Sequence, residues 1–164
     1  MISQNEFNAL INQTTAYLHF EDGQSFCGMT NLKSDDQRLE KGLWGEAAFT
    51  TGMSGYEETM TDPSFLGQHI IFTTSHVGNY ESDSRVWQSS KCHASAIIAR
   101  NFSPCKFLIE KDVPLFHSLD TRALVKYLTS TTHHKSVITM SETAPAKEAF
   151  NSAKLFCDDL ERVS

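Results

Sequence analysis

One stretch of this chain, residues 45–79, limits the possible folds more than any other. In order, it contains a strand-like run, a turn between two glycines, a short helix, an Asp-Pro break and a second apolar strand. Ser54, with Glu57 three residues later, has the pattern of a capping box, which satisfies free amides at a helix start. Asp62-Pro63 then ends the helix, because the residue before proline is driven out of the α region. This alternation of strands and helices predicts an α/β fold with a mixed sheet.

The rest of the chain also divides into short elements. A capping box at Ser3 and an apolar stripe predict a helix over residues 3–13. Residues 15–20 and 25–30 form an expected hairpin around Asp22-Gly23, a pair suited to positive φ. The polar segment 31–41 is expected to be an exposed loop. Further strands are predicted at 43–51, 68–75, 93–99 and 136–140. Further helices are predicted at 106–111, at 122–128 with Asp120 as the cap, and from Pro145 through Phe150, Ala153 and Phe156.

Composition excludes several classes of protein. The 164 residues carry a net charge of −6, and the 14 basic residues are scattered, which argues against a nucleic-acid partner. The longest apolar runs are too short to cross a bilayer, and the N-terminus lacks the pattern of a signal peptide. With 40% hydrophobic residues, the chain has enough apolar side chains for one core. We therefore expect a single cytoplasmic domain that contacts neither nucleic acid nor membrane.

The cysteines and histidines do not predict a metal site. The four cysteines lack paired close spacing, so we expect reduced thiols that mostly serve packing. Cys92-His93 and His133-His134 are adjacent pairs, whereas zinc ligands need intervening residues in order to converge on one ion.

Three motifs within and beside the central stretch resemble the N-terminal domain of carbamoyl phosphate synthase small subunits. They are Thr50-Thr51-Gly52-Met53-Ser54-Gly55-Tyr56-Glu57-Glu58, Thr61-Asp62-Pro63-Ser64-Phe65 and Val77-Gly78-Asn79-Tyr80. The family has F-N-T-G-M-T-G-Y-Q-E, T-D-P-S-Y and I-G-N-Y-G at these places. Upstream, Phe20-Glu21-Asp22-Gly23 with Phe26 and Gly28 is similar to the family's opening hairpin. Downstream, residues 96–100 and Leu119-Asp120-Thr121-Arg122-Ala123-Leu124 are similar to its V-R-D strand end and its I-D-T-R-A-L helix start.

The resemblance covers roughly residues 17–156. It implies a layered swivelling β/β/α domain over residues 15–164, preceded by an added helical segment at 1–14. That helix either docks a partner or simply folds onto its own domain. The resemblance also implies a set of structural positions: Gly52, Ser54, Gly55, Tyr56, Asp62, Pro63, Gly78, Asn79, Asp120 and Arg122.

The functional implications of the resemblance concern a larger complex. The family hydrolyses glutamine and passes ammonia to a large subunit, which makes carbamoyl phosphate for arginine and pyrimidine synthesis. The expected partners are therefore that large subunit and a glutaminase domain, with self-association also considered, and no cofactor is implied. Ser64 matches a serine that helps hold the substrate glutamine in the assembled complex. Read without the family, Ser64 is a turn hydroxyl that bonds nearby backbone.

An alternative is a free-standing binding or scaffold protein derived from that domain. Ser75 and Glu81 replace a usual proline and a usual glycine of the family, and the segment after Arg100 is shorter. The turn before Tyr56 is also open to two interpretations, since it either holds an anion on free amides or is a self-capped helix start.

We predict no catalytic residue in this chain and hence no glutaminase activity. The family's nucleophile is a cysteine in a G-x-C-x-G turn, where amides stabilise the oxyanion, and none of Cys27, Cys92, Cys105 and Cys157 has that setting. His19-Phe20-Glu21 imitates the family's His-x-Glu but occupies the opening strand. An ammonia-release assay with glutamine checks this expectation, and release that is abolished by changing a single cysteine would contradict it.

Overall fold

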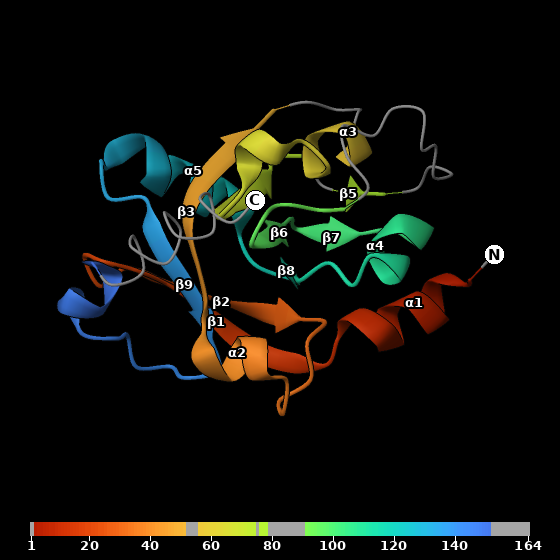
Figure 1. The fold of residues 1–164 in the computed structure, drawn as a ribbon, viewed down its shortest axis with the longest axis horizontal. Helices are drawn as coiled ribbons and strands as arrows, with labels where there is room; N and C mark the ends of the chain where they lie inside the picture. The colour runs from red at the N-terminus through yellow and green to blue at the C-terminus, as the bar shows by residue number, and fades with distance from the viewer. Residues whose placement is uncertain (1, 52–55, 75, 79–90, 152–164) are drawn as a thin grey trace.

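The computed structural model describes residues 2–51, 56–74, 76–78 and 91–151 (Figure 1). The helices are α1 (Gln4–Ile11), α2 (Gln37–Lys41), α3 (Tyr56–Met60), the 3-10 turn η1 (Pro63–Phe65), α4 (Lys106–Glu110) and α5 (Thr121–Ser130). The strands are β1 (Thr14–Phe20), β2 (Ser25–Thr30), β3 (Leu43–Thr50), β4 (Gln68–Phe72), β5 (His76–Val77), β6 (Ala96–Ile98), β7 (Asn101–Phe102), β8 (Leu115–His117) and β9 (Lys135–Thr139).

Seven of these strands form a closed barrel in the order β1-β2-β8-β6-β4-β3-β9. The run β3-β4-β6-β8 is parallel, and the other pairings in the barrel are antiparallel. The connections between parallel strands carry α3 and α4, as parallel pairing requires a crossover. The α/β class, the mixed sheet and the single domain are thus confirmed. Closure into a barrel was not part of the expected layered arrangement.

Alternation along the parallel strands divides the apolar residues into two cores. In β4, Ile71 belongs to one cluster, while Ile70 and Phe72 belong to the other. Successive side chains of a strand point to opposite faces, so each strand serves both cores. One cluster joins the strands to Leu124 and Leu128 of α5, and the other joins them to α1, α3 and α4.

The N-terminal helix and the hairpin follow the sequence closely. Ser3 caps α1 by accepting a hydrogen bond from the Glu6 amide at 3.1 Å, although the helix ends two residues earlier than expected. Phe7 and Ile11 are buried in the core, so α1 folds onto its own domain. The β1–β2 hairpin is confirmed, and Gly23 in its turn has φ +93°.

The expectation of an exposed loop at 31–41 is wrong. This segment contains α2, and it buries Leu32 and Leu39 in the same cluster as Leu124 and Leu128 of α5. Asp36 caps α2, and its carboxylate also binds Arg38 at 2.9 Å. The sequence did not reveal this burial for two reasons. The two leucines stand among many polar residues, and a helix of five residues shows almost no periodicity.

The expected boundaries in the second half were partly wrong. The strand predicted at 93–99 is limited to β6, and the short strands β7 and β8 were not predicted. Asp120 caps α5 as expected, accepting from the Ala123 amide at 3.0 Å, and β9 is confirmed one residue earlier than predicted. Residues 147–151 are helical, and the rest of the predicted last helix, with Ala153 and Phe156, lies outside the described residues.

A buried histidine connects three strands inside the fold. His69 of β4 is fully buried, and its Nε2 lies 2.9 Å from the Leu43 carbonyl oxygen, which only accepts, so Nε2 carries the proton. Its Nδ1 then accepts from the Ser136 hydroxyl at 2.7 Å. Burial lowers the pKa of His69 to about 4, because the charged imidazolium is poorly solvated there.

We predict that Gly28→Ala destabilises the barrel by about 3 kcal/mol, near the upper end of overpacking costs. A Cβ at Gly28 would lie 2.5 Å from the His117 carbonyl oxygen and 2.9 Å from the Phe116 ring, where β2 meets β8. Gly23→Ala is the control, since its Cβ meets nothing within 4 Å and only the positive φ costs about 1 kcal/mol. Urea denaturation measures both variants, and an equal loss would contradict the close approach.

We further predict that His69 makes the fold less stable in acid. The unfolded imidazole protonates near its ordinary pKa of about 6.5, whereas the folded one resists until about 4, so stability is complete above that range and is lost as pH falls through it. The contribution is about 2 kcal/mol between pH 8 and pH 5. Urea denaturation at both pH values should show that His69→Gln loses less unfolding free energy between pH 8 and pH 5 than the wild type does. His133→Gln, which alters an exposed histidine, should retain the wild-type loss.

Candidate functional site

The segment from α3 to η1 is anchored to the core at its start. Tyr56 packs edge-on against Phe72, with ring centroids 5.4 Å apart, and Met60 is fully buried. The Thr61 hydroxyl donates to the Glu57 carbonyl oxygen at 2.7 Å and closes the last turn of α3. The chain therefore leaves α3 in a fixed direction.

Ser64 lies in η1, shortly after the end of α3. Asp62 is extended, with φ −73° and ψ 118°, which fits a residue before proline. Its Oδ1 accepts from the Ser64 amide at 2.9 Å, and Pro63 starts η1. The Ser64 side chain is exposed, and its hydroxyl makes no hydrogen bond to any described residue. The turn therefore fixes the Ser64 backbone and leaves its hydroxyl available.

Other predicted motif positions fall in two groups. Gly52, Ser54, Gly55 and Asn79 lie outside the described residues, as do Ser75 and Glu81, so both interpretations of the turn before Tyr56 and the altered loop remain predictions. Gly78 is described and has φ +105°, and a Cβ there would lie 2.7 Å from the Ser103 carbonyl oxygen. Its role as a structural glycine has a clear physical reason.

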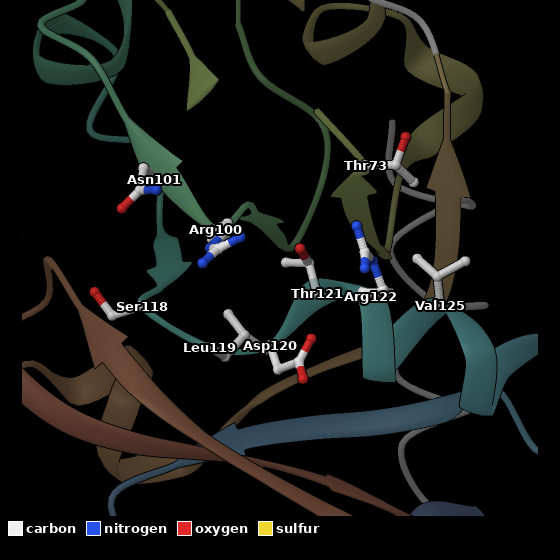
Figure 2. Close-up of a pocket in the computed structure, with 9 residues that line it drawn as sticks. All are labelled: Thr73, Arg100, Asn101, Ser118, Leu119, Asp120, Thr121, Arg122 and Val125. Carbon is white, nitrogen blue, oxygen red and sulfur yellow. The ribbon is translucent and has the colours of Figure 1, made fainter. Parts of the chain in front are cut away.

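A cavity of about 880 Å³ lies at the carboxyl ends of β4, β6 and β8 (Figure 2). Thr73 follows β4, Arg100 follows β6, and Ser118 follows β8. The start of α5 completes the wall. The full lining is Thr73, Arg100, Asn101, Ser118, Leu119, Asp120, Thr121, Arg122 and Val125. Crevices beside the carboxyl ends of parallel strands are common ligand sites.

Two of the predicted motif residues line this cavity together with residues from distant parts of the chain. Asp120 and Arg122 were predicted as structural positions, and Asp120 indeed caps α5. Ser64 is not among the described residues that line this cavity. Ser118 has φ +63°, a strained value for a residue with a side chain, which no local pattern revealed. The position of Arg100, two residues after the parallel strand β6, was the one available signal.

Among the described residues, no thiol, histidine pair or metal cluster has the environment of a catalytic centre. Burial raises the pKa of Cys92 to about 11 and also raises that of Cys105, which disfavours the nucleophilic thiolate. His19 is buried and bonds the Ser25 hydroxyl and the Ser141 carbonyl oxygen, while Glu21 binds His133. His19 and Glu21 therefore serve separate structural contacts. No group of three potential metal ligands occurs in the described ranges.

No described helix is long and apolar enough to cross a membrane.

Comparison with known proteins gives a consistent result. The model of the family described as carbamoyl-phosphate synthase small chain, CPSase domain, matches residues 18–138. The carbamoyl phosphate synthase small chain of Caldanaerobacter subterraneus subsp. tengcongensis is 36% identical over 134 residues, covering 75% of this chain and 36% of the relative. The arginine-specific small chain of Geobacillus stearothermophilus is 35% identical over 122 residues, covering 68% and 33%.

A third relative matches over a longer range. The small chain of Listeria monocytogenes serovar 1/2a is 33% identical over 165 residues, covering 92% of this chain and 44% of the relative. The chain thus spans less than half the length of these curated relatives.

We predict that alkylation separates the described cysteines by exposure. In a Cys157→Ser background, iodoacetamide at neutral pH should modify exposed Cys27 first. Cys92 should react far more slowly, because its pKa of about 11 leaves about a hundredfold less thiolate than an ordinary thiol. Peptide mass spectrometry measures each rate, and rapid selective labelling of Cys92 or Cys105 would contradict a purely structural role. The same reaction in urea should equalise the rates.

Proposed function

We propose, because this chain belongs to the carbamoyl phosphate synthase small-chain family, that it acts as the non-hydrolytic interface and positioning domain of such a small chain. In this role it would join a glutaminase domain to a large subunit. The complex would use glutamine, bicarbonate and ATP to form carbamoyl phosphate for arginine or pyrimidine synthesis.

The observation that carries this proposal is the extent of the family match. The match runs from residue 18 to residue 138, and Leu18 of β1 pairs directly with Ile138 of β9. Its two ends therefore meet at the seam where β9 closes the barrel. The family similarity includes residues from all seven strands of the barrel, which supports a shared architectural role.

A non-hydrolytic role agrees with the chemistry of the described residues. The pKa values of Cys92 and Cys105 are raised by burial, and His19 is engaged in backbone and serine contacts. We propose that the nucleophile resides in the glutaminase partner, with no cofactor needed in this domain. We also propose a cytoplasmic location and a swivelling β/β/α relationship for this domain.

Ser64 is the proposed contribution of this domain to the glutamine site. Its hydroxyl is exposed, while its amide is held by Asp62 at 2.9 Å. A fixed backbone with a free hydroxyl suits a side chain that reaches across to a partner. The segment 1–14 remains a proposed addition to the family domain, and the scaffold alternative is not favoured by relatives that are small chains.

We predict that Ser64→Ala weakens glutamine use in a complex with the glutaminase and synthetase partners. The loss of one hydrogen bond to a charged group should lower kcat/KM for glutamine by about ten- to hundredfold. Synthesis from free ammonia should be unchanged, because it bypasses the glutamine site. Steady-state assays with each nitrogen source measure the two effects.

Ser130→Ala is the matched control for that experiment. Ser130 is also exposed, and its hydroxyl donates to the Tyr127 carbonyl oxygen within α5. It should leave both reactions unchanged. An unaltered kcat/KM for glutamine in Ser64→Ala would place Ser64 outside the site.

A further inference from the structure

The cavity at the start of α5 gathers positive charge on an acidic protein. Arg100 and Arg122 come from different elements and both line it, although the chain has a net charge of −6. Figure 2 shows the two side chains extending on the same side of the α5 start, with Thr121 between them in this view. Neither guanidinium has an ion pair or a hydrogen bond with a described residue. Two cations placed together without a carboxylate partner favour an external anion.

Thr121 adds a hydroxyl group to the cavity wall. It is only 7% exposed and lines the cavity, yet its hydroxyl forms no hydrogen bond with the described residues. The Thr121 hydroxyl is therefore open to the cavity, where it can donate to a bound polar group.

The first turn of α5 adds backbone amide donors, whose partial positive charge also favours an anion. Asp120 accepts from the Ala123 amide, whereas the amides of Thr121 and Arg122 occupy the first turn, where helix geometry provides no intrahelical acceptor. These amides and the helix dipole favour a negative group. Asp120 also lines the cavity, and its Oδ1 accepts from the Ala123 amide, so the described lining combines two positive side chains with one negative one.

The remaining lining limits the kind of anion. The Ser118 hydroxyl is not a spare donor, because His117 Nε2 lies 3.0 Å from the Ile11 carbonyl oxygen and so carries the proton, which leaves Nδ1 to accept from Ser118 at 2.8 Å. Donors therefore concentrate around Arg100, Thr121 and Arg122. Leu119 and Val125 form an apolar part of the wall, and about 880 Å³ exceeds the size of a bare ion.

We propose that this cavity binds a small molecule that carries a phosphate group, with Arg100 and Arg122 contacting the phosphate oxygens and Thr121 donating its hydroxyl. Arginine forks match phosphate oxygens in bidentate geometry, and the apolar wall accommodates the organic part of a phosphate ester. This site is separate from the Ser64 turn, so it can fail while the proposed function stands, and the reverse also holds.

Calorimetric titration of the 164-residue chain with inorganic phosphate at low, constant ionic strength tests the proposal. The wild type should show saturable binding, and Arg100→Gln and Arg122→Gln should each weaken it by about tenfold or more. Thr121→Val, which keeps the shape and removes the hydroxyl, should weaken it by a smaller factor. Lys126→Gln removes an exposed cation of the same helix that does not line the cavity, and it should have no effect.

Thermal melting provides a second measurement that separates binding from folding. Phosphate should raise Tm for the wild type and for Lys126→Gln, but not for the double variant Arg100→Gln/Arg122→Gln. All four single variants should melt near the wild type without phosphate if they are folded.

Absence of saturable binding by the wild type, or equal binding by the double variant, would overturn the proposal. Loss of large-subunit binding in the arginine variants without any phosphate binding would instead assign the cavity to an acidic protein segment and would also overturn it.

Discussion

The pairing of β9 with two strands at once is the constraint on which the rest of this structure depends. β9 pairs with β1 on one side and β3 on the other, and β8 joins β2 to β6 on the opposite part of the ring. With both junctions made, no strand of the barrel has an unpaired edge. Closure also fixes which face of each strand turns inward, and this separates the two apolar cores.

Closure of the barrel determines where polar side chains can gather. The interior contains few polar side chains, and those such as His69 and Ser136 satisfy each other. The parallel strands β4, β6 and β8 share one direction, so the residues that follow them collect at one end of the barrel. That end holds Arg100 and Ser118 beside the start of α5. The Ser64 turn lies in the crossover before β4 and is presented independently of this cavity.

Sequence patterns predicted the local features well. The caps formed by Ser3 and Asp120 and the Asp62-Pro63 break were correctly predicted, because each depends on groups within three residues of one another. The family motifs around Tyr56 and Asp120 also indicated the family that the comparisons support. The burial of Leu39 and the strand β8 were missed, since their elements are too short to show a period and are stabilised by distant partners.

The sequence by itself determined the starts of α1 and α5, the hairpin, the α/β class and the lack of a G-x-C-x-G turn, because these follow from neighbouring residues and their chemistry. Only the tertiary structure decided that the sheet closes, that α1 packs its Phe7 into the core, and that Thr73, Arg100 and Arg122 face one cavity. These residues are far apart along the chain. Strand register and closure bring them together, and both depend on hydrogen bonds between distant segments that no local pattern encodes.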